Sequence, residues 1–118
     1  MGPSQDEKIE KMTFASVFPH YRNKVERKNQ SLDDLNSIIQ WLTGLNQNEL
    51  NDCIEKKLTL KELFDLAAVP NNAYNIKGNI CGIKIQEITN PLTQKVRILD
   101  KIVDDLAKGK SVEKITSP

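Results

Sequence analysis

The sequence predicts an all-α protein: a single compact domain of five or six helices packed around one long C-terminal helix. Three observations lead to this expectation. Apolar residues recur every three or four positions, which is the spacing of one face of an α-helix. Four of these segments begin at a residue that can cap a helix. The chain has 118 residues, 38% of them hydrophobic, which suits one core and is too short for two domains.

The long helix is predicted over residues 90–110. Asn90 offers a side-chain acceptor to the first free N–H groups, and Pro91 occupies the first helical position, where its missing N–H costs nothing. Gly109 suits the left-handed residue that follows a helix. The apolar face carries seven residues: Leu92, Val96, Ile98, Leu99, Ile102, Val103 and Leu106. This stripe covers about half of the helix, so the other elements are expected to pack around it.

The opposite face of this helix is charged. It carries Arg97, Asp100, Lys101, Asp104, Asp105 and Lys108. Asp104 precedes Lys108 by four residues and Arg97 precedes Asp100 by three, so these side chains are predicted to pair along the helix. We expect this face to be solvated.

The beginning of the chain has weaker signals. Residues 1–11 show no periodicity and are expected to be disordered or poorly ordered, which places the helical domain at residues 12–118. The domain opens with a small apolar cluster: Phe14, Val17 and Phe18. Pro19 is predicted to lie in the first turn of a charged helix that holds Tyr21 and Val25.

A second helix is predicted from Ser31 to Gly44. Ser31 and Asp34 form a start like a capping box, with Asp in place of the usual Glu, and Gly44 supplies the stop. The face expected to be buried holds Leu35, Ile38, Ile39 and Leu42. Trp41 lies beside this face, and we expect it to belong to the core.

Two shorter helices follow. The first covers residues 47–57, and one face carries Leu50, Cys53 and Ile54, with Leu58 just beyond. The second opens at Thr59, where Glu62 completes a full capping box, and it ends at Pro70. Its inward residues are predicted to be Leu60, Leu63, Phe64 and Ala67.

Residues 80–88 fit two structures. Three apolar positions alternate as in a strand: Cys81, Ile83 and Ile85. Ile85 and Ile88 also fit one helical turn. A lone strand has no visible partner in this chain, so we favour a helical or irregular segment, with a short strand-like stretch near 80–86 as the alternative. Residues 111–115 are predicted to add a last helical turn after the long helix.

Four blocks of the chain are specific in combination: FASVFPHY (residues 14–21), WLTG (41–44), ICGIKIQEI (80–88) and NPLTQKVRILDKIVDDLAKGKSVEKI (90–115). Together they resemble a small bacterial family catalogued as a domain of unknown function, number twenty-two hundred, from about Ile9 onward. The resemblance implies a compact cytoplasmic bacterial protein, and it brings no activity, cofactor or partner. Family members often have Tyr in place of Phe18 and an acidic residue in place of Gln86. The missing carboxylate weakens any acid–base role for residue 86.

The charge and the cysteines exclude several classes of protein. Seventeen basic and sixteen acidic residues leave a net charge of +1, which gives no general attraction for nucleic acid or anionic membranes. No run approaches the length of a membrane span, and the first residues are polar where a secretory signal is apolar. Cys53 and Cys81 have no CxxC partner, so we expect two reduced thiols in a cytoplasmic protein.

Three residues are candidates for a site: His20, Tyr21 and Cys81. His20 is the only histidine, and its ordinary pKa lies near neutrality. Cys81 precedes Gly82, and a thiol next to a tight backbone turn is a potential nucleophile. Together they predict a site where residues 18–21 meet residues 80–82. The competing interpretation, which we favour, is that Cys81 packs in the core and His20 is structural.

Other ligands are not expected. The glycine spacing matches no phosphate-binding loop, so no cofactor is predicted. With one histidine and no clustered ligands, no metal is predicted either. A basic run, Arg22, Lys24, Arg27 and Lys28, is diluted by Glu26, and no recognition helix follows, so we do not expect nucleic acid as a partner.

The sequence therefore specifies a fold better than a function. We expect a protein-interaction or homo-oligomeric module without catalytic activity, because the long helix has a wide apolar stripe and few aromatic residues to cover it. The alternatives are an enzyme with a site near His20 and Cys81, and a weak nucleic-acid-binding helical domain.

Overall fold

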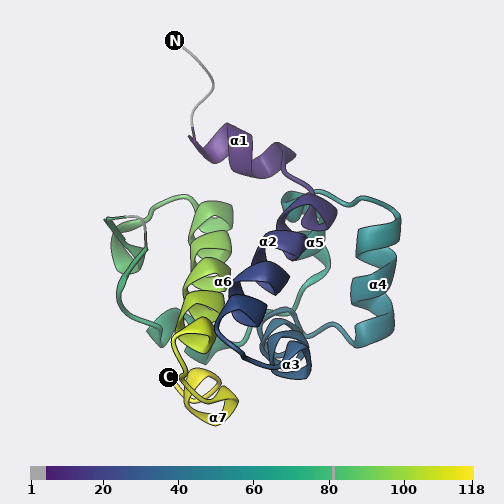
Figure 1. The fold of residues 1–118 in the computed structure, drawn as a ribbon. Helices are drawn as coiled ribbons and strands as arrows, with labels where there is room; N and C mark the ends of the chain where they lie inside the picture. Colours follow the sequence, from purple (N-terminus) through teal and green to yellow (C-terminus); the bar gives the residue numbers. More distant parts are fainter. Residues whose placement is uncertain (1–4, 81) are drawn as a thin grey trace.

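Helix α6 (Pro91–Ala107) lies in the middle of the molecule, as predicted (Figure 1). The computed structural model describes residues 5–80 and 82–118. Helices α2 (Phe14–Arg27) and α3 (Leu32–Thr43) pack against α6. Helices α4 (Gln47–Glu55), α5 (Leu60–Leu66) and α7 (Val112–Ile115) complete the predicted set, so the all-α class is confirmed. Within the described residues, 5–80 and 82–118, no helix has both the length and the apolar content of a membrane span.

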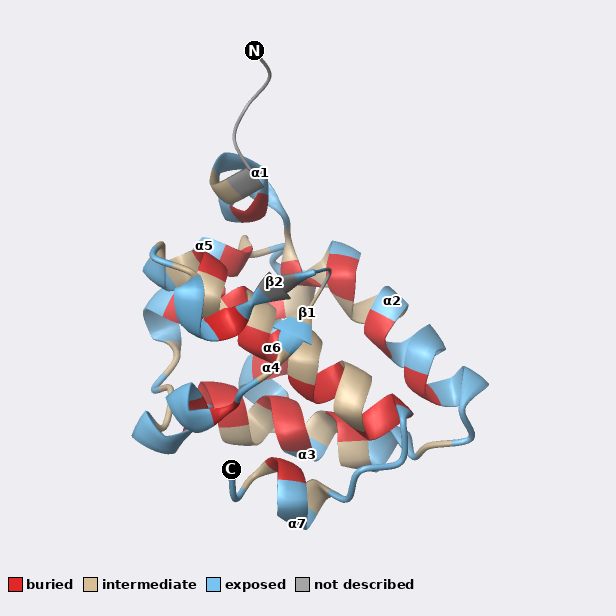
Figure 2. Ribbon diagram, turned by 90° about the vertical axis from the view of Figure 1, so that its left-hand side faces the viewer, coloured by how far each residue is buried: buried red, intermediate tan, exposed pale blue. Residues whose placement is uncertain are grey.

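The core is built from the stripes that the sequence predicts. Ile98, Leu99 and Val103 of α6 are fully buried. So are the four predicted residues of α3: Leu35, Ile38, Ile39 and Leu42. Trp41 is half-buried and packs against this core. Figure 2 shows that α2 and α7 turn their buried residues toward the other helices and their exposed residues outward.

Helix starts follow the predicted caps. The Ser31 hydroxyl accepts hydrogen bonds from the backbone N–H groups of Asp33 and Asp34 at 3.1 and 3.4 Å. Thr59 and Glu62 form the complete capping box that was predicted, and Asn46 and Glu49 form a second one that was not. At α6, the Asn90 side chain accepts from Thr93 N–H. Each cap satisfies an N–H that has no partner within its helix, which fixes where the helix begins.

Helix α2 begins at Phe14, earlier than a start with Pro19 in the first turn allows. Thr13 caps it, accepting from Ser16 N–H at 3.1 Å, so Pro19 lies inside the helix and not in its first turn. A proline within a helix costs roughly 3 kcal/mol. Burial of Phe14, Val17 and Tyr21 along one side of α2 offsets that cost. Tertiary packing therefore overrides the local signal of proline.

The N-terminal segment also differs from the prediction. Residues Gln5–Lys11 form helix α1, so the disorder expected for residues 1–11 does not apply to this part. Ile9 is only 4% exposed, and Asp6 accepts a hydrogen bond from the Thr93 hydroxyl. Helix α1 lies against α5 and α6. A helix with one buried apolar residue has no repeat, so periodicity could not reveal it.

Residues 79–87 contain both structures that the sequence left open. Strand β1 (Asn79–Ile80) pairs antiparallel with β2 (Ile83–Lys84), and a 3₁₀ turn, η2 (Ile85–Glu87), follows. The partner that a lone strand seemed to lack is the same segment folded back on itself at Gly82, whose φ is +79°. An earlier 3₁₀ helix, η1 (Asn71–Asn75), leads into this hairpin.

Candidate functional site

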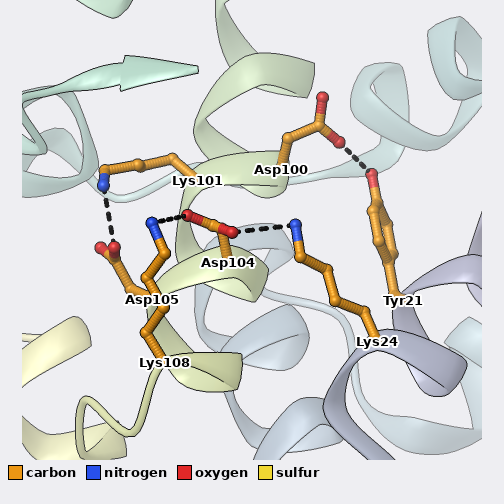
Figure 3. Close-up of polar contacts among 7 residues, drawn as sticks. All are labelled: Tyr21, Lys24, Asp100, Lys101, Asp104, Asp105 and Lys108. Carbon is orange, nitrogen blue, oxygen red and sulfur yellow. Dashed lines mark hydrogen bonds and ion pairs between the residues drawn. The ribbon is translucent and has the colours of Figure 1, made fainter. Parts of the chain in front are cut away.

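The polar face of α6 carries a chain of ion pairs (Figure 3). The Asp104 carboxylate accepts from Nζ of Lys24 at 2.9 Å and from Nζ of Lys108 at 2.8 Å, and Lys101 pairs with Asp105 at 2.9 Å. The predicted pairing of Asp104 with Lys108 is therefore confirmed. The prediction that this face is solvated is wrong for Lys101, Asp104 and Asp105, because their side chains are only 15–17% exposed. Helix α2 and strand β1 lie against α6, and Lys24 of α2 reaches Asp104 on this face.

At one end of this face, Tyr21 of α2 meets Asp100 of α6. The Tyr21 hydroxyl donates a 2.6 Å hydrogen bond to Asp100 Oδ1, and Arg97 Nη1 lies 3.2 Å from Asp100 Oδ2 (the Tyr21 bond in Figure 3). Tyr21 is 8% exposed. Burial, followed by the charge and hydrogen bond of Asp100, raises the pKa of Tyr21 far above its ordinary value. Tyr21 is therefore a neutral hydrogen-bond donor to Asp100 and not a base.

Two hollows flank the Tyr21–Asp100 hydrogen bond. The smaller, about 210 Å³, is lined by His20, Tyr21, Lys24, Ile80, Asp100 and Val103. The other, about 260 Å³, lies beside α1 and is lined mostly by apolar residues, with Arg97 and Lys8 as its cations. The same two residues, Tyr21 and Asp100, thus form part of both walls.

Of the three site residues predicted from the sequence, the structure describes His20 and Tyr21. Exposed His20 lies on α2 next to buried Tyr21, and both line the smaller hollow with Ile80 of β1. Cys81 lies outside the described residues. The convergence of His20 and Cys81 therefore stays a prediction, although Ile80 precedes Cys81 directly in the chain.

The sequence did not identify Arg97 and Asp100 as part of this site. It paired them correctly along α6, but it treated them as surface residues. Their position at the edge of the apolar stripe, next to Val96 and Leu99, is the available signal that they are partly covered. Their contact with Tyr21 spans 79 residues of chain and leaves no local pattern.

Cys53 has the packing role that its helical spacing predicts. It is 3% exposed on α4. Burial raises the pKa of the Cys53 thiol, and the nearby charges of Asp52 and Glu49 raise it further. A protonated buried thiol is a poor nucleophile.

A third hollow, here called the α4–α5 groove, has a different character. It measures about 230 Å³, and apolar side chains form most of it: Leu45, Cys53, Leu58 and Leu66. Leu66, at the end of α5, is 62% exposed and is the most exposed large hydrophobic residue of the described chain. Glu49, Asp52 and Lys56 of α4 and its C-cap line the groove as well.

Comparisons with known proteins give a family and a structure of similar fold, but no activity. Residues 8–117 match the model of a family described as an uncharacterized protein conserved in bacteria, DUF2200. No curated protein sequence matches the chain. The chain is similar to the crystal structure of an uncharacterized protein, SP1917, with 36% identity and a TM-score of 0.87, over 99% of this chain and 95% of that one.

Proposed function

Since the chain belongs to the uncharacterized bacterial family DUF2200, we propose its role from geometry alone: a non-catalytic interaction module that pairs with a second copy of itself through the α4–α5 groove. The resemblance drawn from the sequence is confirmed by the family match. The proposal keeps the role expected from the sequence but moves the contact surface. The apolar stripe of α6 is covered by α2 and α3 within one chain, so it is not free to bind a partner.

The exposed side chain of Leu66 carries this proposal. A leucine with 62% of its surface in water leaves favourable burial unused, because burying a fully exposed leucine is worth roughly 1.5–3 kcal/mol and most of Leu66 is still exposed. Single exposed leucines are ordinary. Leu66, however, lies at an apolar groove, where Leu45 and Leu58 extend the surface that a partner would cover.

The partner in this proposal is a second copy, with the groove of one copy placed against the groove of the other. A two-fold interface places the same patch on both sides, so an exposed knob must face a hollow of the same patch. In this arrangement exposed Leu66 is the knob, and the hollow that it lines with Leu45 and Leu58 receives Leu66 of the other copy. The charges agree, since Lys56 of one copy can face Glu49 or Asp52 of the other.

Static light scattering across a range of protein concentrations tests this proposal. The monomer has a mass of 13.4 kDa. We expect the weight-average mass to rise toward twice that value at micromolar to millimolar concentration. A monomer mass throughout would reject self-association and leave a different protein as the partner of the groove.

We also propose that the protein works in the cytoplasm. The support is the cysteine usage: two thiols far apart in sequence, with no CxxC pair and no disulfide framework.

A thiol enzyme is the second candidate function, and one observation favours it. His20 and Tyr21 line the same hollow as Ile80, the residue before Cys81. An imidazole within reach of Cys81 would favour its thiolate form. In this proposal His20 is the base, Cys81 the nucleophile and Tyr21 a wall of the hollow.

Alkylation of the intact protein, mapped by peptide mass, separates this candidate from the first. The ordinary pKa of a thiol is about 8.5. We expect alkylation of Cys81 at a pH well below this value, and slower alkylation of Cys81 in His20→Ala. Buried Cys53 is the internal control. Ordinary reactivity of Cys81 in both proteins would leave only the interaction role.

A further inference from the structure

The hollow beside α1 combines apolar walls with an incompletely paired arginine. Its volume is about 260 Å³. The apolar walls come from α1, α2, α5 and α6 and the residue after α1: Ile9, Val17, Leu60, Val96 and Met12. Lys8, Arg97, Tyr21 and Asp100 supply the polar part. Few polar groups in an otherwise apolar hollow are typical of a small-molecule site.

Arg97 is the unusual member of this set. Its side chain is only 11% exposed, and Nη1 bonds to Asp100 Oδ2 at 3.2 Å. Its Nε is buried and has no hydrogen-bond partner among the described residues. A guanidinium offers five N–H donors, and a buried donor without an acceptor is costly. The arginine therefore has donors left for an acceptor that residues 5–80 and 82–118 do not provide.

The charges in the hollow favour an anion. Two cations, Arg97 and Lys8, face one carboxylate, Asp100, which already accepts from both Tyr21 and Arg97. Tyr21 stays neutral as the donor of its hydrogen bond. Asp6 of α1 does not line the hollow, and its carboxylate accepts from the Thr93 hydroxyl. One negative charge would balance the lining residues.

We propose that this hollow binds a small amphipathic carboxylate, with its head group on Arg97 and Lys8 and its chain against Ile9, Leu60 and Val96. The size sets the length of the chain. At the volume of liquid water, about 30 Å³ per molecule, 260 Å³ holds about nine non-hydrogen atoms. Hexanoate, with a six-carbon chain and two oxygens, is of this size. The site is separate from the α4–α5 groove, so this inference does not depend on self-association.

An NMR titration of the isotope-labelled full chain tests the ligand class. We expect hexanoate to cause saturable shifts at residues that line the hollow. Hexylammonium has the same chain with the opposite charge, and it should cause no saturable shift there. Acetate has the charge without the chain, and its dissociation constant should be at least about tenfold higher. Equal binding of hexylammonium, or no saturation by hexanoate up to about 10 mM, would overturn the proposal.

Three variants test the position of the site. Arg97→Met removes the head-group contact, and Met12→Trp fills the hollow while it leaves both Arg97 and Asp100 unchanged in sequence. Each should raise the dissociation constant of hexanoate at least about tenfold. Lys108→Met makes the same change of charge on the same helix, outside the hollow, and should bind like the wild type. If Arg97→Met does not fold, Met12→Trp decides. Wild-type affinity in Met12→Trp would overturn the proposal.

Discussion

The Tyr21 hydroxyl donates a 2.6 Å hydrogen bond to Asp100 Oδ1 and so ties α2 to α6 across 79 residues of chain. A hydrogen bond to a charged group contributes about 1.5–3 kcal/mol to stability. We therefore predict that Tyr21→Phe lowers the free energy of unfolding by that amount, measured by urea denaturation. Tyr74→Phe is the matched control, because Tyr74 is 41% exposed and should change stability by less than about 0.5 kcal/mol. Equal losses in both variants would mean that the Asp100 contact contributes nothing.

Ionisation of Tyr21 should be coupled to unfolding. Burial, and then Asp100, raise the pKa of Tyr21 far above the value of about 10 that it has when unfolded. The folded state keeps the proton where the unfolded state loses it, so this contribution to stability is present below about pH 10 and declines as pH rises further. In a Tyr74→Phe background, the ultraviolet absorbance of tyrosinate should appear only together with loss of helical circular dichroism. Tyrosinate in a protein that is still folded would contradict this coupling.

Asp104 should contribute stability at neutral pH that is lost in acid. Burial raises the pKa of Asp104, but hydrogen bonds from Lys108 and Lys24, with their charges, outweigh it and hold the pKa below its ordinary value of 3.8. A lowered pKa in the folded state stabilises the protein above about pH 4, and that stability disappears as pH falls through the folded value.

We therefore expect Asp104→Asn to lower the free energy of unfolding at pH 7 by up to about 1 kcal/mol, because both lysines are largely solvated. The difference from wild type should shrink as the pH is lowered to about 3, in urea titrations at both values. Asp65→Asn, at an exposed position of α5, is the control and should change the free energy of unfolding at pH 7 by less than about 0.5 kcal/mol.

Leu99 should be one of the most costly positions to truncate. It is fully buried in α6, so Leu99→Ala loses transfer energy and leaves a cavity, at a cost of about 2–5 kcal/mol. Leu32→Ala, at a position 38% exposed, should cost much less. Chemical denaturation of both variants makes the comparison. A neutral Leu99→Ala would place α6 outside the core.

The parts of the fold that the sequence predicted are those with local signals. The cap at Ser31, the capping box of Thr59 and the start of α6 at Asn90 each depend on residues three or four positions apart. The predicted start of α2 was wrong because the preference of Pro19 for the first turn of a helix is a local signal, whereas the burial of Phe14 and Val17 that overrides it is tertiary.

Helix α1 and the β1–β2 hairpin are too short to repeat a pattern. The site around the Tyr21–Asp100 hydrogen bond depends almost wholly on tertiary contacts. His20 and Tyr21 stood out by residue type, but nothing near them in sequence points to Asp100 or Arg97. Leu66 lies outside the inward face predicted for α5, and its exposure agrees with that prediction. The α4–α5 groove itself could not be predicted, because Leu45 and Leu58, which line it with Leu66, come from other segments of the chain.

Sedimentation equilibrium of three proteins tests the central claim most directly: that two copies pair through the α4–α5 groove. Leu66→Asp places a charge in the proposed interface, and Leu32→Asp makes the same change at an exposed leucine of α3. We predict that wild type and Leu32→Asp associate with the same dissociation constant and that the constant of Leu66→Asp is at least about tenfold higher. Equal association of all three proteins, or a wild type that stays at its monomer mass, would contradict the account.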